Sequence, residues 1–99
     1  MLEDASVEDV ILAVVQKANN VADVAANDSQ RFELVRDFAD AVSMWLDRAS
    51  NADQETFRQV SSNYFLDKKY FGDYAITESN KSATLILLLA TIYNPPTVL

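Results

Sequence analysis

The stretch QRFELVRDFADAVSMWLDRA, residues 30–49, decides the fold class of this 99-residue chain. At about 100° per residue, its apolar side chains gather on one side of a helix, and its charged side chains gather on the other. The pattern therefore predicts an amphipathic helix over residues 30–49 with Trp45 mostly buried. The apolar side consists of Phe32, Val35, Phe38, Ala39, Val42, Trp45, Leu46 and Ala49.

Three further segments have helical patterns, over residues 7–26, 54–70 and 79–93. Ser6 is the expected N-terminal cap of the first segment, and the break at Asn27–Ser29 supplies the cap of helix 30–49. The break at Ser50–Asp53 supplies the cap of the third segment. Thr77 or Ser79 is the expected cap of the last. Residues 94–96, Asn-Pro-Pro, end the last helix and leave a short extended tail over 94–99. We therefore predict an all-α fold, a compact four-helix bundle-like single domain with short connections. Trp45 is then expected to pack against the first or fourth helix.

Residues 66–76 are compatible with two structures. In the first, the helix continues to residue 70 and Gly72 is the left-handed residue just beyond its end. Tyr70 and Leu66 point away from the apolar face of such a helix. The second structure therefore stops the helix near Leu66 and leaves the aromatic residues in an irregular loop.

Composition excludes several chemistries. The chain has no Cys, no His and one Gly, so disulfides, Ser-His or Cys-His catalytic pairs and glycine-rich phosphate loops are absent from it. We therefore predict a protein that is not an enzyme, with no catalytic residues, no metal site and no cofactor.

The charge balance also limits the possible partners. Eight Lys and Arg stand against 15 Asp and Glu, for a net charge of −7. Nucleic acids and anionic membranes both attract basic surfaces, so neither is an expected partner. The longest apolar run is far short of the roughly 20 residues that span a bilayer, and no signal peptide is visible. The expected location is the cytoplasm.

The polar side of the helix over 30–49 carries the most specific surface signal. Glu33, Asp37, Asp40 and Asp47 fall within an arc of about 80° opposite the apolar side, and Met44 lies inside that arc. We call these five residues the acidic ridge. An acidic surface with an adaptable thioether at its centre suits a basic protein partner.

Aromatic residues around the single glycine are a second candidate contact surface. Tyr70 and Tyr74 flank Gly72, and tyrosine is enriched at binding hot spots. The predicted function is thus to neutralise or regulate a basic protein, in the manner of an immunity protein, antitoxin or inhibitor. Small acidic helical proteins of those classes share bulk properties with this chain, and no motif. The acidic ridge would steer the encounter, while Met44, Tyr70 and Tyr74 would anchor it. An acidic nucleic-acid mimic is a further alternative.

The last predicted helix is apolar on two faces. One face holds Ala83, Ile86, Leu87, Ala90 and Tyr93, and the opposite face holds Leu85, Leu88, Leu89 and Ile92. Both faces need cover. On the second face, we expect at least three of the four side chains to be buried, either by other helices of the same chain or by a second copy of the protein. The alternative function is therefore a homo-oligomeric structural or assembly subunit, such as a homodimer, with an interface formed by Leu85, Leu88, Leu89 and Ile92.

Overall fold

The computed structural model describes residues 2–77 and 80–93, with side chains up to residue 91. Four helices and a small two-stranded hairpin make up this part of the chain, so the predicted all-α, four-helix architecture is confirmed. The fourth helix changes from α to π winding partway along, which the sequence pattern did not predict. The elements are α1 (Val7–Val24), α2 (Asp28–Arg48), α3 (Asn51–Asp67), β1 (Tyr70–Phe71), β2 (Tyr74–Ala75), α4 (Asn80–Leu87) and the π-helix η1 (Leu88–Tyr93).

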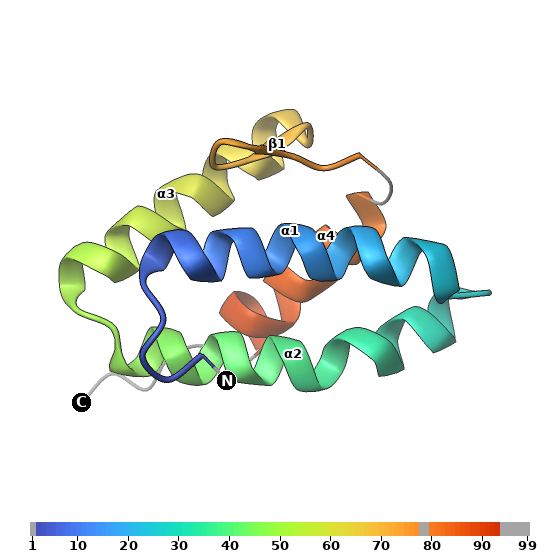
Figure 1. Ribbon diagram of the computed structural model, residues 1–99, viewed down its shortest axis with the longest axis horizontal. Helices are drawn as coiled ribbons and strands as arrows, with labels where there is room; N and C mark the ends of the chain where they lie inside the picture. The colour runs from blue at the N-terminus through green and yellow to red at the C-terminus, as the bar shows by residue number, and fades with distance from the viewer. Residues whose placement is uncertain (1, 78–79, 94–99) are drawn as a thin grey trace.

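Short polar side chains cap the first three helices. Ser6, Asn27 and Ser50 each accept a hydrogen bond from a backbone N–H three residues further on, which satisfies an end group that the helix itself cannot pair. The donor nitrogens belong to Asp9 at 3.2 Å, Gln30 at 2.9 Å and Asp53 at 3.1 Å. The cap of α3 is Ser50, so this helix begins at Asn51 and not near residue 54. Short loops join α1 to α2 and α2 to α3, so the chain reverses direction between successive helices (Figure 1).

The core lies where α4 crosses α1 and α2. Helix α4 packs on both of them, and η1 continues along α2. From α1 come Val10 and Val14, from α2 Val35 and Val42, and all four are fully buried. An aromatic cluster extends this core toward α3 and the hairpin. Its ring centroids are separated by 5.9 Å for Trp45 and Phe57, 5.6 Å for Phe57 and Phe71, and 6.1 Å for Tyr64 and Phe71.

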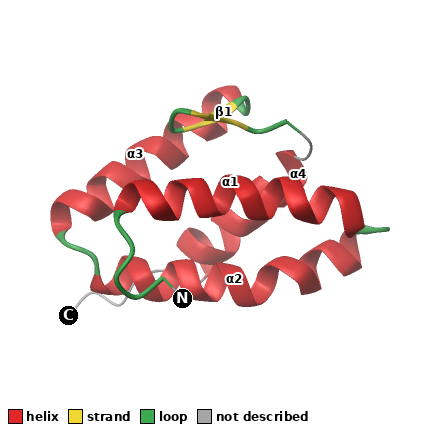
Figure 2. Cartoon of the chain, in the orientation of Figure 1, coloured by secondary structure: helices red, strands yellow, loops and turns green. Residues whose placement is uncertain are grey.

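The segment after α3 is a hairpin, which neither sequence-based structure predicted. Helix α3 ends at Asp67, where Lys68 adopts left-handed geometry with φ of 61°, so a helix reaching residue 70 is wrong and an end near residue 66 is confirmed. The following residues are not an irregular loop. Tyr70 pairs with Ala75 and Phe71 with Tyr74, and the two strands appear in yellow in Figure 2. Gly72, with φ of 66°, makes the two-residue turn possible.

Trp45 is buried as predicted, but it has contacts that the sequence did not predict. Only 5% of it is exposed, and its indole Nε1 donates a 2.9 Å hydrogen bond to the carbonyl oxygen of Ala5. Its ring packs on Phe57 of α3. The tryptophan therefore fastens the N-terminal segment to the end of α2.

Two predictions about the ends of helices need correction. Phe32, predicted on the buried side of α2, is 40% exposed because α4 crosses α2 further along and leaves the first turns of α2 beside an open pocket. Thr77 does not cap the fourth helix, which begins at Asn80. The alternative cap Ser79, the break at 94–96 and the tail 94–99 lie outside the described residues, as do the side chains of Ile92 and Tyr93.

Candidate functional site

The acidic ridge lies on the solvent side of α2. Glu33, Asp37, Asp40 and Asp47 are all exposed, as the helical spacing predicts. The carboxylate of Asp37 is 93% exposed and lies 3.9 Å from Nε of Arg36. Exposed charges interact weakly with close partners but together create a field that extends about a Debye length from the surface.

Met44 borders a hollow between α2 and the N-terminal segment. The side chain is 57% exposed and lines a cavity of about 110 Å³. Leu2 and Trp45 contribute apolar walls, while Glu3 and Arg48 stand at its edge. Met44 thus connects the acidic ridge to a hollow with apolar walls, and an apolar recess of this kind suits an anchor side chain of a partner.

Folding adds three acids near the end of the acidic ridge that the helical pattern did not reveal. Glu3, Asp4 and Asp53 line a neighbouring hollow of about 230 Å³. They come from the N-terminal segment and the first turn of α3. The Trp45–Ala5 hydrogen bond holds the N-terminal segment in this place. No periodicity connects these positions, so only the tertiary structure could identify them.

The two tyrosines lie on a different part of the molecule from the acidic ridge. Tyr70 is 55% exposed and Tyr74 is 39% exposed, both on the hairpin. In Figure 1 the hairpin lies on one side of α1 and α2 lies on the other. The structure therefore does not bring the predicted anchors Tyr70 and Tyr74 together with Met44.

The apolar face of the last helix is only partly covered. Leu85, Leu88 and Leu89 are half-buried, so the expectation that at least three of the four would be buried is not met. The side chain of Ile92 lies outside the described residues. The opposite face is buried as predicted, at Ala83, Ile86, Leu87 and Ala90.

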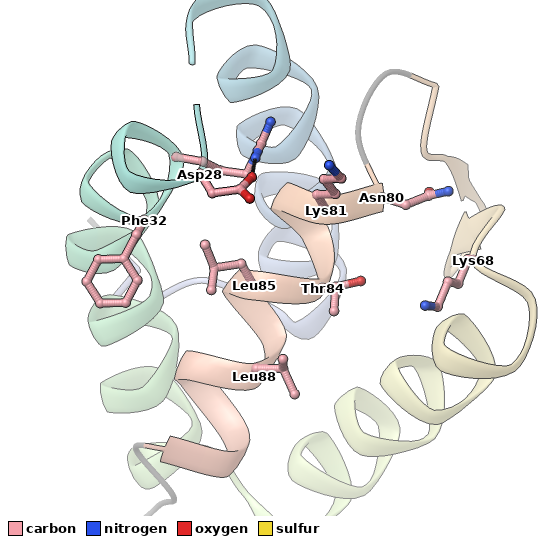
Figure 3. A pocket seen from close by; sticks show the side chains of 9 residues that line it. Asp28, Phe32, Lys68, Asn80, Lys81, Thr84, Leu85 and Leu88 are labelled. Carbon is pink, nitrogen blue, oxygen red and sulfur yellow. Dashed lines mark hydrogen bonds and ion pairs between the residues drawn. The ribbon is translucent and has the colours of Figure 1, made fainter. Parts of the chain in front are cut away.

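A larger pocket lies where the start of α2, the end of α3 and α4 meet. Its volume is about 440 Å³. Figure 3 shows Phe32 on one side, Lys68 on the other, and Thr84 and Leu85 of α4 between them. The lining residues are Asp28, Arg31, Phe32, Lys68, Asn80, Lys81, Thr84, Leu85 and Leu88. We call this the basic pocket, because three of its residues are cationic and one is anionic.

Tyr64 supports one wall of the basic pocket from behind. Its buried hydroxyl donates a 2.9 Å hydrogen bond to the Asn80 carbonyl oxygen and lies 3.2 Å from Oγ1 of Thr84. Burial raises the pKa of the Tyr64 phenol above its ordinary value, and the hydrogen bond from Thr84 partly opposes that rise. A neutral phenol therefore connects α3 to α4 at this wall.

No protein-family model, curated protein or solved structure matches this chain. Among residues 2–77 and 80–93, no helix is long and apolar enough to cross a bilayer. Within the same ranges, no group of three or more His, Cys, Asp or Glu residues is arranged to hold a metal ion.

The surface thus offers two sites of opposite character. The acidic ridge and the hollow beside Met44 suit a cationic partner with one apolar side chain. The basic pocket suits an anion with an apolar body, since cationic and apolar side chains share one cavity. The two sites therefore differ in the chemistry of the ligand that would fit them.

Proposed function

We propose that this protein binds and regulates a basic protein through the acidic ridge of α2. The observation that carries the proposal is the exposure of Glu33, Asp37, Asp40 and Asp47 on one helix face around an exposed Met44. Charges in this arrangement accelerate association with a cationic surface. The role is that of a non-enzymatic inhibitor or regulator, comparable with an immunity protein or antitoxin.

The hollow beside Met44 supports a defined docking position. A flexible thioether adapts to different side chains, and the hollow is walled by Leu2 and Trp45. Acids of the N-terminal segment extend the negative surface beyond the helix. An apolar or long basic side chain of the partner would fill the hollow, and its surrounding cations would meet the acids of the acidic ridge.

The position of the hairpin changes the expected footprint. In Figure 1, α1 lies between the hairpin and α2, so the two tyrosines and Met44 belong to separate parts of the surface. We assign Met44 as the anchor on the acidic ridge. Tyr70 and Tyr74 are not part of this proposed contact.

Affinity capture with charge-matched variants tests this function. The ridge variant combines Glu33→Gln, Asp37→Asn, Asp40→Asn and Asp47→Asn. A control variant removes the same number of charges elsewhere on the exposed surface, by Glu8→Gln, Asp23→Asn, Glu55→Gln and Asp67→Asn. We expect one or more basic proteins from the source cells to bind the wild type and the control, and not the ridge variant. Binding is then repeated with the purified partner.

Two outcomes would count against the proposal. In one, the ridge variant keeps the same partners as the wild type. In the other, both variants lose them equally, which would make net charge and not the acidic ridge responsible. Circular dichroism of each variant establishes that it is folded before binding is compared.

A further inference from the structure

We propose that the basic pocket binds a small organic carboxylate with an apolar body, such as a medium-chain fatty acid or an aromatic acid. The site is separate from the acidic ridge, and the proposal does not depend on the function assigned to it. Phe32, Leu85 and Leu88 offer an apolar surface, while Arg31, Lys68 and Lys81 offer positive charge. Its volume of about 440 Å³ falls within the range of small-molecule sites.

The apolar half of the pocket consists of side chains that the fold leaves uncovered. Phe32 is 40% exposed although it continues the apolar side of α2. Leu85 and Leu88 are half-buried on α4 and η1. An apolar ligand body lying against these three side chains would remove them from water, which favours binding.

The cationic half is unexpected in so acidic a chain. Three of the eight basic residues line this cavity, against one of the 15 acidic residues, Asp28. Asp28 already pairs with Arg31, which leaves Lys68 and Lys81 without an ion-pair partner among the described residues. The Nε of Arg31 is buried and also has no acceptor within the described part of the chain. A carboxylate in the pocket would supply an acceptor for the two exposed lysines.

The net charge of −7 favours a small anion over a large one. A nucleic acid or an acidic protein would extend past the pocket onto acidic surface and be repelled there. A single carboxylate inside the pocket would lie nearer to its lining cations than to the acidic side chains outside it, whose field salt screens. The wall that carries Asn80 and Thr84 is fixed by the hydroxyl of Tyr64, so part of the cavity is formed before a ligand arrives.

Nuclear magnetic resonance titration of the full chain tests the site with three probes of equal tail length. They are decanoate and the cation decyltrimethylammonium, each below its micelle concentration, and the neutral alcohol decanol below its solubility limit. We expect saturable chemical-shift changes with decanoate that centre on Phe32, Thr84 and Leu85. Decanol should bind several-fold more weakly, and the cation should not saturate.

Single-charge variants separate the pocket from general electrostatics. Lys68→Gln and Lys81→Gln change exposed side chains and leave the core intact. Their combination should weaken decanoate binding roughly tenfold or more. Lys69→Gln removes one charge, as each single variant does, from a neighbouring exposed residue that does not line the pocket. It should change the affinity by less than about twofold, and by less than Lys68→Gln or Lys81→Gln alone.

Three results would overturn the proposal. The first is no saturable binding of decanoate, or shift changes centred away from the pocket. The second is equal affinity for decanoate and decanol, or a loss of decanoate affinity in the Lys69 variant as large as in the Lys68 and Lys81 variants. In either case the cations of the pocket would play no specific part. The third is a dimer in light scattering whose interface contains Leu85 and Leu88 and which decanoate does not displace. In that case a second copy, and not a small ligand, occupies the pocket.

Discussion

The hydroxyl groups of Tyr64 and Thr84 lie 3.2 Å apart and connect α3 to α4 inside the protein. The phenol has one proton, which it donates to the carbonyl oxygen of Asn80 at 2.9 Å. Thr84 must therefore be the donor in the contact with Tyr64. The pair orients the start of α4, and with it one wall of the basic pocket.

Replacing Tyr64 with Phe should lower the free energy of unfolding by about 1–2 kcal/mol. The ring still fills its place in the core, but Thr84 and the Asn80 carbonyl lose a partner. Urea unfolding followed by circular dichroism measures the change. Tyr70→Phe is the matched control, because that phenol is 55% exposed and its removal should leave stability within about 0.5 kcal/mol of wild type. Equal stability of the two variants would show that the Tyr64 hydrogen bonds contribute nothing net.

The raised pKa of Tyr64 predicts a pH dependence of stability at high pH. Burial disfavours the phenolate, so the folded state holds the phenol proton to a higher pH than the unfolded chain, whose pKa is near the ordinary 10.0. By linkage, the stability conferred by the neutral phenol is fully present below pH 10. It falls as the pH rises through the unfolded pKa toward the folded pKa. The stability difference between wild type and Tyr64→Phe should therefore shrink above pH 10, and a constant difference would refute the assignment.

The helical architecture was predictable because it depends on local periodicity. Val35, Ala39 and Val42 are buried where the spacing placed them, and Ser6 caps α1 as expected. The hairpin also has a local sequence signal. A Gly-Asp pair between two aromatic segments is typical of a two-residue turn, and Gly72 has the positive φ that such a turn requires.

The sites were predictable only where one helix provides them. The acidic ridge lies entirely on α2, so its exposure followed from spacing alone. The basic pocket combines Arg31 of α2, Lys68 just after α3 and Lys81 of α4, and no pattern along the chain relates these positions. The separation of Tyr70 from Met44 also depends on packing, since α1 lies between the two elements that carry them.

Trp45→Ala should destabilise the protein by about 3–5 kcal/mol, enough to unfold much of the population. The substitution removes the ring packed on Phe57 and the hydrogen bond to Ala5. Trp45→Phe keeps most of the volume and loses the hydrogen bond, so it should cost clearly less. Thermal unfolding compares the two variants. An unchanged melting temperature for Trp45→Ala would mean that the indole is not part of the core.

Gly72→Ala should destabilise the hairpin by about 1–3 kcal/mol. A Cβ at this position would lie 2.9 Å from Cγ2 of Ile11, and the φ of 66° strains any other residue. Lys68 provides a control in which stability should change in the opposite direction, because this residue adopts a φ of 61° although it is not glycine. Lys68→Gly should stabilise the protein by up to about 1 kcal/mol. Denaturant unfolding measures both changes, and stabilisation by Gly72→Ala would disprove the left-handed turn.

The steering role of the acidic ridge predicts how association with the captured basic partner depends on salt. The association rate should fall steeply as ionic strength rises past about 0.1 M, where the Debye length nears 10 Å. Replacing Asp37 and Asp40 together by Asn should lower the association rate more than it raises the dissociation rate, because exposed charges act mainly before contact. Stopped-flow mixing measures both rates, with Glu55→Gln plus Asp67→Asn as the charge-matched control. An association rate that does not respond to salt would rule out steering, whatever the affinity of the complex.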